Sequence, residues 1–146
     1  MVQVIKGDIF DSDTQTLVNT VNCVGVMGKG IALIFKQKYP KMFARYKELC
    51  DKKLIKVGSL WLYKAEAQWV LNFPTKDHWR NPSEIEYLKL GLKRFVETYE
   101  EKGITSISFP LLGASNGGLD PDVSLRLMKE YLKDVKIPVF IYDNRK

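Results

Sequence analysis

Two glycine-bearing segments of this chain have the composition of loops that bind phosphate groups. Residues 19–32 read NTVNCVGVMGKGIA, a strand-like start followed by three glycines and an apolar helical run. Residues 110–120, PLLGASNGGLD, again follow an apolar strand and precede a helix. Glycine lets backbone N–H groups crowd around an anion, and a helix N-terminus adds partial positive charge. Two such loops in one small domain predict two walls around one elongated ligand that contains phosphate.

The well-known phosphate motifs do not describe the first of these loops. A Walker A loop needs a hydroxyl after its lysine, whereas Lys29 is followed by Gly30 and Ile31. A dinucleotide fingerprint needs a third glycine soon after Gly28 and Gly30, and the chain supplies none there. The loop therefore predicts phosphate binding of another kind.

The chain has 146 residues, 45% of them hydrophobic and 27% charged, which indicates a single globular domain over residues 1–146. Its net charge of +6 favours a polyanionic partner, with a set of merely solvated lysines as the alternative. Cys23 and Cys50 have neither a disulfide framework nor a metal-site spacing, so we expect a reduced, cytoplasmic protein without a metal. No apolar run approaches the ~20 residues of a membrane span, so we expect no membrane partner. We also expect a monomer.

Short β-branched or aromatic runs alternate with helical patterns along the chain. We expect strands over Val2–Ile5, Thr16–Val21, Ser59–Tyr63, Trp69–Phe73, Ile104–Phe109 and Val139–Tyr142. We expect helices over 83–101, after Asp120–Pro121, and in two pieces over 30–53 that break at Tyr39–Pro40. This alternation predicts an α/β fold with helices on both faces of a sheet, and a ligand beyond the carboxyl ends of the strands.

Two of these helices carry more specific signals. Ser83 and Glu86 have the spacing of a capping box, and Gly103 is a stop signal after the same helix. The helix after Asp120 is expected to direct five side chains inward: Val123, Leu127, Met128, Tyr131 and Leu132.

Four segments, in this order, resemble the macrodomain family, whose members bind ADP-ribose: residues 6–10, 18–22, 28–32 and 113–118. The resemblance covers essentially the whole chain. It implies an α/β fold of three layers, α/β/α, with a central mixed sheet of about six strands. It also implies ADP-ribose as ligand or product and no cofactor.

Within this resemblance each segment takes one part of ADP-ribose. Asp8 corresponds to the acid that recognises the adenine, with a turn residue as the alternative. Asn22 corresponds to the residue beside the distal ribose, with a strand-end turn as the alternative. The glycine loops correspond to those that embrace the diphosphate, where Lys29 contacts phosphate or points to solvent. The complete set expected to bind ADP-ribose is Asp8, Ile9, Asn19, Asn22, Val26, Met27, Gly28, Lys29, Gly30, Ile31, Ala32, Thr75, Leu112, Gly113, Ala114, Ser115, Asn116, Gly117, Gly118 and Leu119.

Residues 72–80, NFPTKDHWR, are similar to a stretch of the DarG-type antitoxin macrodomains, which remove ADP-ribose from thymidine in single-stranded DNA. That branch is related to the terminal ADP-ribose glycohydrolase, in which a lysine and an aspartate serve catalysis. The resemblance therefore assigns catalysis to Lys76, assisted by Asp120 of a matching G-L-D segment. The alternatives are a surface charge for Lys76 and a helix N-cap for Asp120. The second loop departs from the family at Ala114–Asn116, where Cys-Gly is typical.

The chemistry of glycosidic cleavage gives these residues their roles. The reaction places positive charge on the sugar and negative charge on the leaving group. A neutral Lys76 amine can attack the anomeric C1″, either displacing the leaving group or forming a Schiff base with the opened sugar. Asp120 can activate that amine or carry a proton.

Trp79 lies between His78 and Arg80, and an aromatic ring among cations is typical of a single-stranded nucleic acid site. The alternative is a tryptophan packed on the core. The lysines of 36–47 indicate a solvated helix face, with DNA-backbone binding as the alternative. The leading hypothesis is a hydrolase that acts on ADP-ribosylated single-stranded DNA and reverses a cognate DarT-type toxin. The alternatives are a hydrolase of protein-linked or 1″-substituted ADP-ribose, and a reader that binds ADP-ribose without chemistry.

Overall fold

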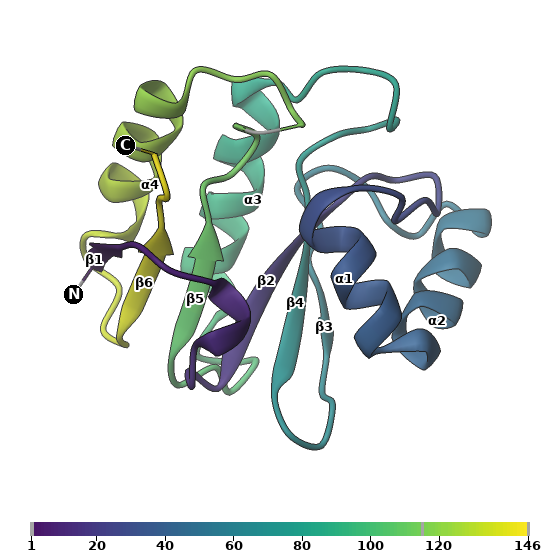
Figure 1. Cartoon of the computed structure of the whole chain (residues 1–146), viewed down its shortest axis with the longest axis horizontal. Helices are drawn as coiled ribbons and strands as arrows, with labels where there is room; N and C mark the ends of the chain where they lie inside the picture. Colours follow the sequence, from purple (N-terminus) through teal and green to yellow (C-terminus); the bar gives the residue numbers. More distant parts are fainter. Residues whose placement is uncertain (1, 115, 146) are drawn as a thin grey trace.

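The computed structural model describes residues 2–114 and 116–145, which form a six-stranded sheet with helices on both faces (Figure 1). The strands are β1 (Val2–Ile5), β2 (Thr16–Val21), β3 (Trp61–Tyr63), β4 (Trp69–Pro74), β5 (Ile107–Pro110) and β6 (Val139–Tyr142). The helices are α1 (Gly30–Lys38), α2 (Pro40–Asp51), α3 (Ile85–Thr98) and α4 (Pro121–Leu132), besides a short 3-10 helix η1 (Ile9–Asp11). All six expected strands and the helix break at Tyr39–Pro40 are confirmed. Over the described ranges, no helix has both the length and the apolar character that crossing a membrane requires.

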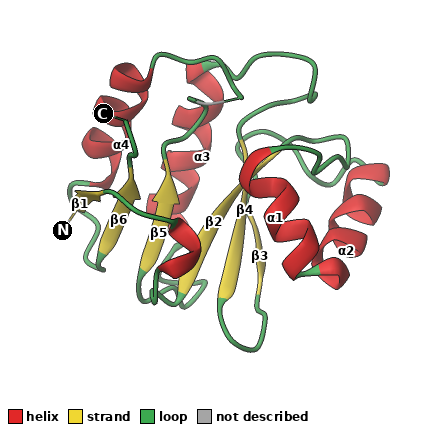
Figure 2. Ribbon diagram, in the orientation of Figure 1, coloured by secondary structure: helices red, strands yellow, loops and turns green. Residues whose placement is uncertain are grey.

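The strand order brings three carboxyl ends together. It is β1-β6-β5-β2-β4-β3, and all neighbours run parallel except β3 and β4, so the sheet is mixed as expected. Because β2 pairs with both β4 and β5, the ends of these three strands lie side by side. Figure 2 shows the loops that follow β4 and β5 at the same, upper edge of the sheet. In parallel α/β sheets ligands bind at this edge.

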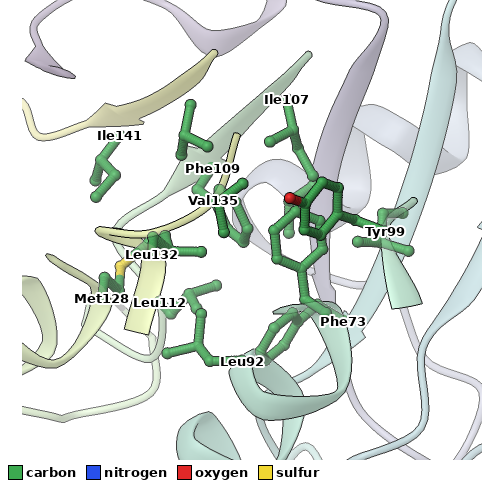
Figure 3. Packing of buried hydrophobic residues seen from close by; sticks show 14 of the residues in the cluster. Phe73, Leu92, Tyr99, Ile107, Phe109, Leu112, Met128, Leu132, Val135 and Ile141 are labelled. Atoms are coloured by element: carbon green, nitrogen blue, oxygen red, sulfur yellow. The ribbon is translucent and has the colours of Figure 1, made fainter. Parts of the chain in front are cut away.

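Successive side chains of the central strands pack into two separate cores, one on each face of the sheet. In β2, Leu17 packs in the cluster that includes α1 and α2, whereas Val18 packs in the cluster that includes α3 and α4. Figure 3 shows part of the second cluster, where Leu92 of α3 lies near Leu112 and Met128 lies beside Leu132 of α4. Since strand side chains alternate with a period of two, burial on both faces fixes the register of β2.

Two expectations about helices are wrong. α3 begins after Glu84 without a side-chain cap, and Ser83 is buried, with its N–H donating to Gly117 O at 2.9 Å. The capping box fails because Ser83 packs against the loop 111–120 and not against the end of the helix. In α4, Val123 is 36% exposed. The other four side chains expected to point inward from α4 do so: Met128 and Leu132 are buried, and Leu127 and Tyr131 pack against the same core cluster.

The end of α3 explains why β5 begins later than the expected Ile104. Gly103 has a φ of +77°, as a stop signal requires, and its N–H donates to Glu100 O. The N–H of Ile104 donates to Tyr99 O, so this residue still belongs to the helix end. The strand therefore starts at residue 107, and β3 likewise starts two residues later than expected, at residue 61.

Candidate functional site

A cavity of about 490 Å³ opens at the carboxyl ends of β2, β4 and β5. Its walls come from three segments that are far apart in the sequence, within residues 20–32, 75–79 and 110–117. The predicted ADP-ribose ligands that line it are Asn22, Val26, Gly28, Lys29, Gly30, Ile31, Ala32, Thr75, Gly113, Ala114, Asn116 and Gly117. Lys76 and Trp79 line it as well, so a candidate catalytic residue and a candidate DNA-binding residue share one cavity.

The first glycine loop, residues 22–29, is held in shape by the side chain of Asn22. Its Oδ1 accepts from the N–H groups of Val24 (3.0 Å) and Val26 (3.3 Å), and its Nδ2 donates to Val26 O (2.7 Å). The Tyr46 hydroxyl of α2 lies 2.7 Å from Asn22 O and 2.9 Å from Asn22 Oδ1 and donates to one of them. Burial raises the pKa of Tyr46, which keeps this hydroxyl a neutral donor. These contacts agree with the strand-end turn that was the alternative for Asn22.

α1 begins at the cavity wall, and its N-terminal N–H groups face a site without local negative charge. Among the described residues, the N-cap Lys29 makes no side-chain capping bond and the first turn holds no acid. Gly30, Ile31 and Ala32 of this turn line the cavity. The first N–H groups of a helix carry partial positive charge and have no intrahelical acceptor. This end of the cavity is therefore suited to bind an anion such as a diphosphate.

The second loop, residues 111–120, packs closely against the first glycine loop and against Ser83. A Cβ added to Gly30 would lie 3.0 Å from Asn116 Nδ2, so the two glycine loops meet there. A Cβ added to Gly117 would lie 2.3 Å from Gly113 O and 2.5 Å from Ser83 Oγ. Both distances are too short for a real contact, so only glycine allows this loop to pack on itself and on Ser83.

Lys76 follows β4 on a segment that is tied to the first glycine loop. The N–H of Cys23 donates to Asp77 O at 3.0 Å, and the Cys23 thiol donates to Lys76 O at 3.6 Å. Lys76 is partly buried, and its Nζ donates to Trp79 O at 3.3 Å in an exposed bond between two residues of the cavity wall. Burial, together with the charge of Asp77, raises the pKa of Cys23 to about 12. The thiol beside Lys76 is thus a neutral donor and not a nucleophile at neutral pH.

Trp79 lines the cavity and is 45% exposed, so it is not packed in the core. The Arg80 guanidinium lies over its ring at 4.8 Å, and the ring centroid of His78 is 5.4 Å away. His78 Nδ1 accepts from the N–H of Arg80 at 3.1 Å. An exposed ring with cationic neighbours is typical of sites that stack with the bases of single-stranded nucleic acids.

A second cavity, of about 440 Å³, adjoins the first, because Ile31 and Pro110 line both. The rest of its wall consists of Gly7, Asp8, Ile9, Tyr142 and Asn144. Asp8 caps η1 by accepting from the N–H of Phe10 through Oδ1 (2.9 Å), as the turn alternative predicted. Its other oxygen can still accept from a ligand. The elongated ligand that the two glycine loops predicted stays a prediction, for which these adjoining cavities offer two neighbouring compartments.

Three predicted ligands are buried away from these cavities. Asn19, Met27 and Leu112 are at most 1% exposed. Asn19 Nδ2 donates to Asn72 Oδ1 at 3.1 Å, which links the paired strands β2 and β4. Asn19 is therefore a buried residue of the sheet and does not reach the cavity. Asn22, three residues later in the same motif, lines the cavity wall.

The end of the second loop also lies outside the two cavity walls. Gly118, Leu119 and Asp120 line neither cavity. Asp120 is the N-cap of α4 and accepts from the N–H of Asp122 at 2.9 Å, which is the structural alternative for this residue. Ser115 lies outside the described residues.

Several wall residues were not predicted from the sequence. In the first cavity they are Thr20, Val21, Pro110 and Leu111, and in the second they are Gly7, Tyr142 and Asn144. Most of them lie at or just after the carboxyl end of a strand, where ligands bind in parallel α/β sheets. This rule predicts the edge of the sheet at which a site lies, but it does not select individual residues. Across residues 2–114 and 116–145, no three His, Cys, Asp or Glu side chains gather as a metal site would require.

Comparison with known proteins places the chain in a family. Residues 18–128 match the Macro domain family. Over 97% of its length the chain is 42% identical to the DNA ADP-ribosyl glycohydrolase of Mycobacterium tuberculosis, and over 96% it is 40% identical to that of Thermus aquaticus. It spans about two-fifths of the length of these curated relatives, 42% and 41% respectively.

Solved structures agree with these sequence relatives. The macrodomain of M. tuberculosis DarG superposes with a TM-score of 0.93 at 39% identity, covering 97% of both chains. A structure of Thermosipho africanus DarTG in complex with ADP-ribose gives a TM-score of 0.90 at 40% identity, covering 97% of this chain and 41% of that one. The chain therefore belongs to the macrodomain family, and its fold is that of the DarG macrodomains.

Proposed function

We propose that the two adjoining cavities hold ADP-ribose and that this chain removes ADP-ribose from modified DNA. The observation that carries the proposal is the meeting of Lys76 with both glycine loops in one cavity. The relatives support the substrate, because the 42% and 40% identical chains are named DNA ADP-ribosyl glycohydrolase and the T. africanus structure contains ADP-ribose. The resemblance of residues 72–80 to DarG favours thymidine in single-stranded DNA as the modified group.

The order of the wall residues supports one orientation of the ligand. The adenine enters the second cavity, where Asp8 accepts from its amino group. The diphosphate passes Ile31 and Pro110, which line both cavities, and binds between the α1 N-terminus and the loop 111–120. The distal ribose then reaches Lys76 at the far wall.

Lys76 is the proposed nucleophile. Its neutral amine attacks C1″ of the distal ribose, by displacement on the closed ring or as a Schiff base with the opened sugar. The bond from C1″ to the base breaks, the base leaves with the electron pair and gains a proton, and water then frees ADP-ribose from the lysine. The contacts of Lys76 with Trp79 and Cys23 position the amine for this step. The assisting role of Asp120 stays a prediction that rests on the resemblance.

Release of ADP-ribose from a thymidine-ADP-ribosylated single-stranded oligonucleotide tests the role of Lys76. We expect Lys76→Ala to lower the rate by roughly 10³-fold or more, as for loss of a nucleophile, and to leave ADP-ribose binding by calorimetry nearly unchanged. Lys93→Ala, an exposed lysine of α3, is the matched control and should release at the wild-type rate. Near-wild-type release by Lys76→Ala would contradict the mechanism. Binding without release by the wild type would instead favour a reader or a protein-linked substrate.

The same assay tests stacking of a DNA base on Trp79. We expect Trp79→Ala to raise the KM for the oligonucleotide about tenfold, since stacking contributes ~1–3 kcal/mol per base. The affinity for free ADP-ribose should fall much less, because the base is absent from that ligand. Trp79→Phe keeps an aromatic ring, so its KM for the oligonucleotide should lie between those of the wild type and Trp79→Ala. Equal losses of affinity for the oligonucleotide and for free ADP-ribose would show that Trp79 contributes to binding of ADP-ribose and not of a DNA base.

We also propose that a DarT-type toxin is the partner whose modification this chain reverses. A relative from T. africanus, 39% identical over 97% of this chain, is named as a fusion of a DNA ADP-ribosyl transferase and a DNA ADP-ribosyl glycohydrolase. Cells that express a DNA-modifying transferase of this type should recover growth when the wild-type chain is co-expressed. Co-expression of Lys76→Ala should not restore growth if hydrolysis is the basis of protection.

A further inference from the structure

The positive charge of this chain is concentrated in one layer of the fold. Residues 29–56, which contain α1 and α2, hold nine Lys or Arg against two Asp or Glu, a net charge of +7. The rest of the chain holds 14 basic and 15 acidic residues, a net charge of −1. All nine cations of residues 29–56 are exposed. A layer with this imbalance creates a positive potential over one face of the molecule.

This basic face is continuous with the wall that carries Lys76. The Cγ atom of Lys47 in α2 lies 3.4 Å from where a Cβ on Gly25 would stand, so Lys47 lies against the first glycine loop. The same loop contacts the backbone of Lys76 and Asp77 through Cys23. Two contacts therefore lead from α2 to the candidate catalytic segment. Figure 1 shows α1 and α2 packed together beside β4, the strand that leads to Lys76.

Most of these cations keep their charge available for a partner. Within the part of the chain that the structure describes, the one ion pair of this layer joins Arg45 to Glu48 at 3.0 Å, and both side chains are more than half exposed. Lys36 and Lys38 lie over aromatic rings at 4.4 and 5.0 Å, contacts that orient the amines without neutralising them. Exposed ion pairs contribute little, so this face remains strongly positive.

We propose that the exposed basic face of α1 and α2, beginning at Lys47, binds the phosphates of the DNA strand next to the modified nucleotide. The identity of the polyanion rests on the proposed function, in which the cavity takes ADP-ribose and Trp79 takes a base. The basic face then holds the neighbouring backbone, as cationic grooves do in single-strand binding proteins. Such contacts position the strand without reading its sequence.

Two triple variants with equal charge test where the DNA binds. One carries Lys41→Gln, Lys47→Gln and Lys52→Gln on the α2 side, and the other carries Lys93→Gln, Lys129→Gln and Lys136→Gln on the α3–α4 side. Each lowers the net charge from +6 to +3. Fluorescence anisotropy with an unmodified single-stranded oligonucleotide, over a series of salt concentrations, measures binding. We expect the α2 variant to bind at least roughly tenfold more weakly and to flatten the log–log salt slope by about 2, since each lost phosphate contact removes ~0.7.

The control variant on α3 and α4 should bind the oligonucleotide within about twofold of wild type, because its lost charges lie away from the proposed strand path. Arginine at 41, 47 and 52 keeps the charge and should restore binding, which separates charge from packing. Equal losses in both Gln variants, or no loss in either, would overturn the proposal. Because the DNA is unmodified, this result does not depend on hydrolysis. Failure of the proposed function would appear instead as absent release in the Lys76 experiment.

Discussion

The two units of strand, glycine loop and helix look alike in sequence, but acidic side chains occupy the N-terminus of only one of the two helices. At α1, Lys29 makes no side-chain capping bond and the first turn holds no acid. At α4, Asp120 caps the helix, and Asp122 stands in the first turn with Arg145 Nη1 at 2.7 Å from its Oδ1. Both helix dipoles attract negative charge, but at α4 the chain supplies that charge itself. Only the α1 end is left for an anionic ligand.

The loops of these two units are also held in shape by different means. The first is held by polar bonds from one side chain, Asn22, and by the hydroxyl of Tyr46. The second is held by close packing of Gly117 on Gly113 and Ser83. A diphosphate between them therefore meets an open helix end on one side and a tightly packed backbone on the other. The comparison implies that charge recognition belongs to the first unit and shape to the second.

The largest effect is expected from a change that breaks the packing of the second loop. Gly117→Ala should lower the free energy of unfolding by about 3 kcal/mol, at the upper end for overpacking, because its Cβ would meet the rigid backbone of Gly113. ADP-ribose affinity should fall at the same time. Thermal unfolding and calorimetry measure the two quantities.

Gly118→Ala is the matched control for this change. No atom lies within 4 Å of its added Cβ, although its φ of +77° disfavours a side chain, so we expect a cost of about 1 kcal/mol. If both variants unfold with the same free energy, the second loop adapts to a side chain at 117 and shape is not what it contributes.

An intermediate effect is expected when the N-terminus of α1 receives an acidic side chain, as the N-terminus of α4 already has. Ala32→Glu puts a carboxylate in the first turn of α1, where Ala32 lines the cavity. We expect ADP-ribose to bind roughly tenfold more weakly, because like charges face each other, while the helix itself gains a few tenths of a kcal/mol. Ala32→Gln has the same size without the charge and should lose much less affinity in the same calorimetric titration. Equal losses would mean that bulk, and not charge, closes the site.

The smallest effect is expected at the closed helix end. Asp120→Ala should cost about 1 kcal/mol of stability through the lost N-cap, whereas Asp120→Asn keeps the cap and should cost a few tenths. We expect both variants to bind ADP-ribose like wild type, because Asp120 lines neither cavity. The rate of ADP-ribose release by Asp120→Asn is the sharper measurement. A slow rate with unchanged stability would assign the carboxylate to the chemistry and would show that the α4 end is not merely structural.

Local patterns predicted the elements of this fold well because they depend on neighbours in the chain. β1, β2 and β6 have the expected bounds, and the helix break at Tyr39–Pro40 follows from the restricted backbone of proline. The patterns failed where a residue serves a distant segment. Ser83 has the spacing of a cap, yet it packs beneath Gly117, more than thirty residues away. Asn19 and Asn22 lie in one short motif, yet Asn19 stands within β2 and bonds to β4, whereas Asn22 lies after the strand and bonds within the loop.

The sequence by itself determined that glycine loops follow two strands, that Lys76 follows a third strand, and that the charge gathers in residues 29–56. These are properties of order and composition along the chain. Only the tertiary structure decided that the three strand ends adjoin, that the α1 end is open while the α4 end is filled, and that α2 touches the loop beside Lys76. The physical reason is that a binding site consists of contacts between distant segments, and periodicity specifies which side a residue faces but not what it meets there.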